Sequence, residues 1–356
     1  MSPGTPKEWA EEYRRERPKF EDLTIKLRDL IDSLLASEKI DIVQLDYRTK
    51  TVESFGEKLV RKKEKYINPL SDVTDLVGLR IITYYVEDLT RVGRLLKKEF
   101  SIDANRSIDK RIGLDPSQFG YMSVHYIMSV SPERAAFPEW KTFAGILFEV
   151  QVRTALQHAW AAVDHKLNYK STEEAPAELR RRLFRLSALF ELADDQFSEL
   201  RRAASEVATE YSNAVQMGDL HLSIDAVSLE AYLEKSSVVQ ESVAQAVSSR
   251  WEVDSSSYRE KERRGVLLRI LLEGKIETLA DFERLIGGDA GQLREDYHLL
   301  HDSHVKHHVL PTATPADLLT RLVLFRRGIR SGDLASRYTE EVWNSIEDAR
   351  KEKGRQ

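Results

Sequence analysis

The stretch FEVQVRTALQHAWAAVDHKLNYK, Phe148–Lys170, changes its hydrophobic period part-way along and decides the fold of the first half of the chain. Apolar and polar residues alternate over 148–153, which predicts a strand with one buried and one solvated face. The solvated face carries Glu149, Gln151 and Arg153. Thr154 and Gln157 then fit a capping box, so a helix is expected next. This arrangement suits a site for an anionic ligand, whereas a plain amphipathic strand and helix is the simpler interpretation.

The composition predicts a two-domain protein of the cytoplasm. A chain of 356 residues is too long for one small core. The net charge of −5 gives no overall signal for nucleic-acid binding, so any basic surface must be local. The chain has no cysteine, which excludes disulfides and thiolate metal sites and fits a reducing compartment. No apolar signal core and no stretch long enough to span a membrane is present, so no membrane partner is expected.

Cations follow the first expected strand. Helices over about 7–37 lead to a short strand near 42–45 and then to a helix from about Val52. Arg48 and Lys50 lie at this strand-to-helix junction. Cations beside a helix N-terminus attract phosphate, so the junction is a candidate phosphate site.

The next elements add a carboxylate and further cations. Lys58 lies on the helix after the junction, whose basic outer face is ordinarily just solvated. Asp75 directly precedes a β-branched and aromatic run over 79–86 that contains Arg80. This run predicts a strand, and an amphipathic helix over 88–100 is expected after it.

A basic loop leads into a further strand over 123–130. The loop carries Lys110, and Tyr121, Ser123 and His125 alternate onto one face of the strand that follows. A tyrosine and a histidine on a strand are most often structural. Here they repeat the polar-face pattern of 149–153.

The remainder of the chain is expected to be helical. A long helix over 179–214 begins with an arginine cluster and is followed by a domain boundary at 217–219. The cluster consists of Arg180, Arg181, Arg182 and Arg185. Four histidines have metal-like spacing, but structural or surface roles are favoured over zinc. They are His301, His304, His307 and His308. The predicted domains are 1–40, 41–216 and 217–356.

These segments resemble the synthetase domain of the RelA/SpoT family, specifically its small alarmone synthetases. The matching stretches follow in the family's order over about 41–169: YRTKTVESFGEKL, DVTDLVGLRIITYY, FGYMSVHY and FEVQVRTALQHAWAAVDHKLNYK. The resemblance implies an α+β fold, in which helices flank a mixed β-sheet related to that of nucleotidyltransferases. An all-helical C-terminal domain follows it here. The implied reaction transfers the β,γ-pyrophosphate of ATP to the ribose 3′-hydroxyl of GDP or GTP and releases AMP.

The resemblance also implies roles for individual residues. The implied ATP-binding residues are Arg48, Lys50, Lys58, Arg80 and Lys110, with Arg48 and Arg80 stacking on adenine. The implied acceptor-binding residues are Tyr121, His125, Gln151 and Arg153. The implied catalytic residues, which also bind Mg²⁺, are Asp75 and Glu149. Glu149 would in addition assist deprotonation of the attacking hydroxyl.

Three functions fit this pattern. The first is a pyrophosphokinase that makes guanosine tetra- or pentaphosphate. The second is a toxic branch that modifies the 3′ end of tRNA, with the C-terminal domain as a neutralising or phage-sensing element. The third is a nucleotide-binding module without activity, against which the retained Asp75 and Glu149 argue. The net negative charge of the chain favours a small acceptor over tRNA, and the arginine cluster is then interpreted as the solvated start of a helix. The His-Asp motif of the family's hydrolase half is not seen, so no alarmone hydrolysis is expected.

The helical region after Gly218 is expected to regulate the enzyme, through a protein partner, or to assemble it into a homo-oligomer.

Overall fold

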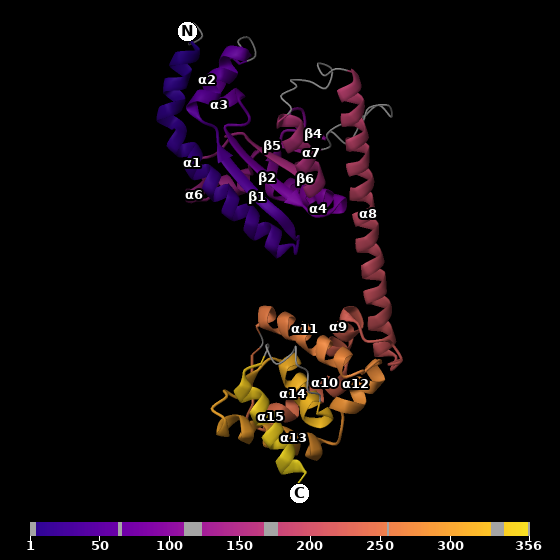
Figure 1. The fold of residues 1–356 in the computed structure, drawn as a ribbon. Helices are drawn as coiled ribbons and strands as arrows, with labels where there is room; N and C mark the ends of the chain where they lie inside the picture. The colour runs from indigo at the N-terminus through magenta and orange to yellow at the C-terminus, as the bar shows by residue number, and fades with distance from the viewer. Residues whose placement is uncertain are drawn as a thin grey trace. The chain divides into compact units, whose positions relative to one another are not determined.

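The computed structural model describes residues 5–62, 66–109, 123–166, 177–254, 256–328 and 338–354. The chain forms two compact units, Met1–Arg201 and Arg202–Gln356, each with its own hydrophobic core (Figure 1). The division falls inside one long helix, α8 (Ala177–Gln216). The boundary predicted at 216/217 instead coincides with the end of this helix, where Gly218 has a φ of 79°.

A mixed β-sheet forms the centre of the first unit, in the strand order β1-β2-β6-β5-β3, with β4 paired to β5. The strands are β1 (Ile42–Thr49), β2 (Val77–Thr83), β3 (Phe100–Ile102), β4 (Ile108–Asp109), β5 (Val124–Val130) and β6 (Phe148–Thr154). The central strands β2 and β6 are parallel, and β1 and β5 flank them in antiparallel orientation. The α+β fold expected from the sequence is therefore present.

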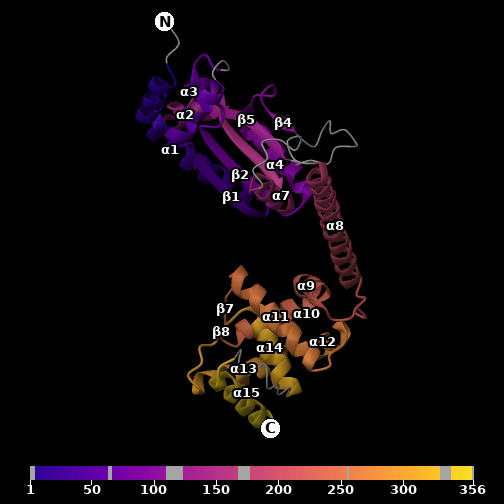
Figure 2. The same ribbon diagram turned by 45° about the horizontal axis from the view of Figure 1, so that its top comes forward.

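Helices cover the apolar face of this sheet. The helices of the first unit before α8 are α1 (Pro6–Ser37), α2 (Val52–Arg61), α3 (Pro69–Asp72), α4 (Val86–Glu99), α5 (Pro132–Ala135), α6 (Pro138–Lys141) and α7 (Ala155–Lys166). α1 lies alongside β1 (Figures 1 and 2), and α4 packs on β6 and β2. Alternate strand residues such as Leu79, Ile81, Val150 and Val152 are buried in one core with Leu23 and Leu27 of α1 and Leu89 of α4. The opposite, polar face of the sheet is thereby left for the site.

The N-terminal part of α8 is anchored to the first unit by polar contacts. The Thr154 hydroxyl donates to Asp194 at 2.7 Å, and Arg201 pairs with the buried Asp88 of α4 at 2.7 Å. The capping box expected at the start of α7 is also present, because the Thr154 amide donates to Gln157 at 3.0 Å and the Gln157 amide donates to Thr154 at 3.1 Å.

The second unit is helical. Its elements are α9 (Ala226–Lys235), α10 (Ser237–Ser248), β7 (Glu252–Val253), α11 (Ser257–Glu273), α12 (Leu279–Ile286), α13 (Ala290–Lys306), β8 (Thr312–Ala313), α14 (Pro315–Arg327) and α15 (Glu340–Lys353). α14 is buried on all sides from Ala316 to Phe325, as expected of a helix that other helices surround. β7 and β8 add a two-residue parallel ladder.

Three of the four histidines with metal-like spacing, His301, His304 and His307, make structural contacts. His304 is buried, and burial lowers its pKa to about 3. His301 contacts Asp302 at 3.0 Å, and His307 contacts Asp348 at 3.0 Å. Across the described ranges, no three His, Cys, Asp or Glu side chains come together in a way that could hold a metal ion. The structural interpretation of these histidines is therefore favoured over zinc.

None of the helices in the described parts of the chain is both long and apolar enough to cross a bilayer.

Candidate active site

Strand register brings the predicted polar residues onto one face of the sheet. Arg48 of β1 lies opposite Gly78 of β2, which lies opposite Glu149 of β6. The next row across the four strands consists of Asp46, Arg80, Gln151 and His125. Because directly paired residues point to the same side of a sheet, both rows face the same space.

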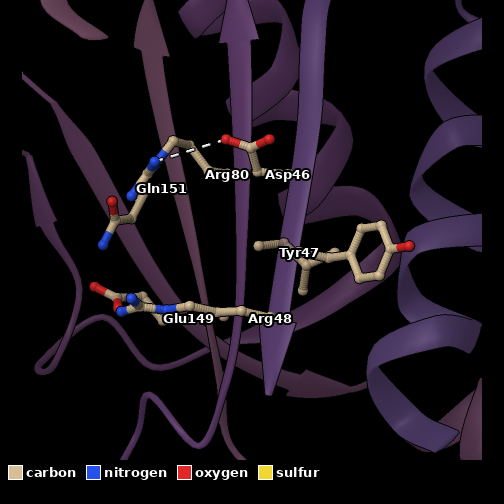
Figure 3. A pocket seen from close by; sticks show the side chains of 8 residues that line it. Asp46, Tyr47, Arg48, Arg80, Glu149 and Gln151 are labelled. Carbon is tan, nitrogen blue, oxygen red and sulfur yellow. Dashed lines mark ion pairs between the residues drawn. The ribbon is translucent and has the colours of Figure 1, made fainter. Parts of the chain in front are cut away.

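A pocket with a cavity volume of about 260 Å³ lies over these rows (Figure 3). It is lined by Asp46, Tyr47, Arg48, Gly78, Leu79, Arg80, Glu149 and Gln151. Figure 3 shows the Arg48 side chain extending to Glu149, Arg80 beside Gln151, and the Tyr47 ring pointing away. The Tyr47 hydroxyl accepts a hydrogen bond from Arg28 of α1 at 3.0 Å. This contact on the far face keeps the neighbouring residues 46 and 48 turned towards the pocket.

The two pocket arginines are spaced for a planar ligand. Arg48 and Arg80 are offset by two residues along paired strands, which corresponds to about 6.8 Å. That distance leaves room for one planar ring between two planar guanidinium groups. The Arg48 side chain passes close to Gly78, where a Cβ atom would lie in van der Waals contact with its Nε atom at 3.7 Å. Asp46 flanks Arg80 at 3.6 Å.

Asp75 forms a tight cluster with two lysines. Its carboxylate oxygens lie 2.9 Å from the Lys50 Nζ and 2.7 Å from the Lys58 Nζ, and all three side chains are largely buried. Burial raises the pKa of Asp75, but the hydrogen bonds and charges of Lys58 and Lys50 outweigh burial and leave that pKa below its ordinary value. The Lys50 backbone is fixed on both sides, by the Tyr13 hydroxyl and by the Leu76 carbonyl. Asp75 is thus ionised at neutral pH.

Glu149 is the second carboxylate of the site. His125 lies 2.7 Å from it through Nδ1 and 2.8 Å from the Ser123 hydroxyl through Nε2. Burial raises the pKa of Glu149, but the hydrogen bond and charge of His125 outweigh burial and lower it overall. The negative charge of Asp75 acts on this pKa in the raising direction, so the two carboxylates lie within electrostatic range of each other.

The C-terminal end of β6 is buried, although the alternation predicted that its polar residues would be solvated. Arg153 is only 5% exposed and donates a hydrogen bond to the Gln151 side chain. His158 of α7 lies within range of these groups, and burial together with the charges of Arg80 and Arg153 lowers its pKa. α7 packs against β6 and β2, so it covers this end of the strand.

The structure therefore brings together most of the residues predicted for the site and adds others. Those in the pocket or next to it are Arg48, Lys50, Lys58, Asp75, Arg80, His125, Glu149, Gln151 and Arg153. Lys110 and Tyr121 lie outside the described residues. Asp46 and Ser123 were given no role from the sequence. Each lies two residues before a predicted site residue on the same strand face, and that spacing is the signal that could have identified them.

Comparison with known proteins assigns this region to a family. Residues 47–174 match the family profile described as the region found in RelA and SpoT proteins. This part of the chain is a RelA/SpoT domain. The GTP pyrophosphokinase YjbM of Bacillus subtilis (strain 168) is 28% identical over 217 residues, which cover 58% of this chain and 94% of that protein. The GTP pyrophosphokinase YwaC of the same organism is 26% identical over 157 residues, covering 44% and 71%.

Solved structures are similar over the same part of the chain. The small alarmone synthetase 1 from Bacillus subtilis is 25% identical, with a TM-score of 0.44, over 55% of this chain and 98% of that one. The same synthetase bound to its product pppGpp is 26% identical, with a TM-score of 0.43, over 56% and 99%.

The donor set of the RelA/SpoT domain fits a divalent cation. Asp75 and Glu149 supply oxygen ligands that are ionised at neutral pH, and magnesium prefers one or two carboxylates together with water or phosphate oxygens. Lys50 and Lys58 both contact Asp75, and ammonium groups of this kind can also bind phosphate oxygens.

Proposed function

We propose that the RelA/SpoT domain transfers the β,γ-pyrophosphate of ATP to the 3′-hydroxyl of GDP or GTP, which yields guanosine tetra- or pentaphosphate and AMP. The observation that carries this proposal is the pair of ionised carboxylates, Asp75 and Glu149, set beside two lysines and two arginines spaced for a ring. The two relatives named GTP pyrophosphokinases support the same reaction.

In this proposal the donor nucleotide occupies the pocket over β1 and β2. The adenine ring stacks between Arg48 and Arg80. Lys50 and Lys58 leave Asp75 and bind the phosphates, since an ammonium group binds phosphate oxygens at least as well as it binds a carboxylate. Lys110 belongs to the same phosphate-binding set by resemblance.

A Mg²⁺ ion held by Asp75 and Glu149 supplies charge neutralisation for the transferred group. The chain's own residues then position the reactants. Glu149 accepts the proton of the attacking 3′-hydroxyl as that oxygen bonds to the β-phosphorus. The bond between the β-phosphorus and the oxygen of the α-phosphate breaks, and AMP leaves with the electron pair.

The acceptor is proposed to lie on the β5 side of Glu149, with Gln151 oriented towards it and Tyr121 stacked on its base. Arg153 is buried and bonded to Gln151, so it acts by orienting that amide. His125 has both ring nitrogens engaged by Glu149 and Ser123. It therefore supports Glu149 and does not itself contact the acceptor.

An acceptor screen tests this function. The full-length protein is incubated with Mg²⁺ and γ-labelled ATP, and separately with GDP, GTP, an adenosine nucleotide or bulk tRNA. Label on GDP or GTP is expected. Charge reversal at the exposed Arg181 and Arg182 should leave that activity within a few-fold. Label on tRNA alone, lost in that variant, would replace this proposal with tRNA modification.

We also infer that the second unit regulates or assembles the enzyme, because it lies outside the matched region and has a core of its own. We propose that the reaction takes place in the cytoplasm, where its nucleotide substrates are found.

A further inference from the structure

Two side chains, His125 and Ser123, connect Glu149 to the interior of the sheet through hydrogen bonds. Glu149 Oε1 lies 2.7 Å from Nδ1 of His125, and Nε2 of the same ring lies 2.8 Å from the Ser123 hydroxyl. Ser123 is completely buried, whereas the His125 and Glu149 side chains are 20% and 15% exposed. The connection thus runs from the rim of the pocket to a site closed to solvent.

The sheet fixes this geometry. Ser123 and His125 are two residues apart and lie on the same face as Gln151, which pairs directly with His125. Glu149 precedes Gln151 by two residues on that face. The β5–β6 pairing therefore places His125 and Glu149, and Ser123 directly precedes β5.

The chemistry of the three side chains determines which atom donates and which accepts in each hydrogen bond. An ionised carboxylate only accepts, so Nδ1 of His125 donates its proton to Glu149. In a ring that carries one proton, Nε2 is then an acceptor and the Ser123 hydroxyl must be the donor. Glu149 thus selects the tautomer, and the hydrogen bond between Ser123 and Nε2 fixes the plane of the ring.

We propose that Ser123 is a positioning residue of the active site, which acts through His125 to hold the Glu149 carboxylate in one orientation. This inference rests on the proposed function for the role of Glu149. The hydrogen-bonded chain itself can be tested in the free protein.

The first test observes the histidine tautomer. Imidazole ¹⁵N spectra of the ¹⁵N-histidine-labelled full-length protein are recorded, and the His125 signals are assigned with His125→Gln. The wild type should show His125 protonated at Nδ1 only. Ser123→Ala should shift the Nε2 signal, because that nitrogen loses its hydrogen-bond donor, while the control Ser129→Ala on β5 leaves it unchanged.

An unchanged His125 spectrum in Ser123→Ala would overturn the proposal. A wild-type ring protonated at Nε2, or at both nitrogens, would overturn it equally. Neither result depends on turnover. Failure of the wild type to transfer pyrophosphate would count against the proposed function and leave this test standing.

The second test separates positioning from structure by kinetics. Ser123→Ala should lower kcat by about 10–100-fold, with the KM for ATP changed by less than about twofold. Ser123→Thr retains the hydroxyl and should recover most of the loss. A raised KM for ATP at unchanged kcat, or equal losses in folded Thr and Ala variants, would contradict a positioning role. Thermal melting identifies any variant that fails to fold, and the tautomer measurement on Ser123→Ala then decides.

Discussion

Asp75 holds the ammonium groups of Lys50 and Lys58 at 2.9 and 2.7 Å, so a proposed metal ligand and two proposed phosphate ligands neutralise one another in the unliganded site. Removing either partner from a buried ion pair leaves the other uncompensated. Metal and nucleotide are therefore expected to bind together, because the phosphates must take the lysines before Asp75 is free for a cation.

Because phosphate must replace Asp75 as the partner of the lysines, Lys50→Gln should change the affinity for metal and the affinity for ATP in opposite directions. Loss of one ammonium group should tighten the binding of Mn²⁺ measured without nucleotide, since Asp75 loses a competitor. It should weaken ATP by about tenfold or more, the value of a charge-assisted hydrogen bond. Calorimetric titrations with Mn²⁺ alone and with ATP measure both effects, and Lys62→Gln at the exposed C-terminal end of α2 is the control. A fall in both affinities would rule out the exchange.

Asp194 makes the stability of the first unit depend on pH. Burial raises its pKa to about 6, although the Thr154 hydroxyl donates to it at 2.7 Å. The folded state therefore holds a proton that the unfolded state releases near pH 4. This contribution to the free energy of unfolding is greatest below about pH 4 and is lost as pH rises to about 6.

Asp194→Asn should remove this pH-dependent cost. The variant is expected to be more stable than the wild type by about 1–2 kcal/mol at pH 7.5 and no more stable at pH 4. Urea denaturation at both pH values measures the difference, with Glu210→Gln at an exposed position of the same helix as the control. A gain of equal size at both pH values would show that Asp194 does not titrate as described.

At the scale of elements, local sequence patterns predicted individual strands and helices, but they did not predict how these elements pack together. The alternation over 148–153 predicted β6, and the spacing of Thr154 and Gln157 predicted the cap of α7 that the hydrogen bonds confirm. The same alternation predicted a solvated Arg153, but α7 packs back on β6 and that residue is buried. Alternation assigns a residue to a face of the strand, and it contains no information about what later covers that face.

Register explains the other residues that sequence reasoning missed. Asp46 joins the pocket because β1 pairs with β2 in the register that sets it opposite Arg80. Ser123 meets His125 because both point to the face that Glu149 shares. The two-residue spacing from Arg48 and from His125 assigns Asp46 and Ser123 to a strand face, whereas the pairing of strands that are distant in sequence is not contained in any local pattern. Lys110 and Tyr121 stay predictions from the family resemblance.

Gly78 on β2 provides a test of the two-arginine slot. Gly78→Val places methyl groups where the Arg48 side chain crosses the strand, and a β-branched residue is well suited to a strand. The KM for ATP should rise by about tenfold or more, since displaced stacking and phosphate contacts are each worth about 1–3 kcal/mol. Steady-state kinetics measures it, and Gly265→Ala in α11, where a Cβ meets open space, is the control. An unchanged KM at retained folding would place the ring elsewhere.

At the scale of the whole chain, the described cores of the two units have no residue in common. The family match ends at residue 174, so α8 and the second unit lie beyond it. α8 also exposes a series of large apolar side chains: Leu186, Leu189, Leu192, Phe197, Leu200 and Val207. Exposed apolar side chains gathered on one element support the proposal that this part of the chain serves assembly or regulation.

A fragment ending at Gln216 tests that separation. It should fold and make product, because the core of the first unit is complete without later residues. Its rate, or its mass in solution by light scattering, should differ from that of the full chain. A fragment that fails to fold would refute the independence of the two cores. Equal rates and equal masses would refute the regulatory and assembly roles.

The most direct test of pyrophosphate transfer is the stoichiometry of AMP and product in a reaction with ATP and GTP, followed by ³¹P NMR. One AMP should appear for each guanosine pentaphosphate formed. Asp75→Asn and Glu149→Gln should each lower the rate by about a thousandfold, since loss of metal charge stabilisation costs several kcal/mol, with native-like circular dichroism. Release of ADP in place of AMP, or near-normal turnover in either variant, would contradict the account.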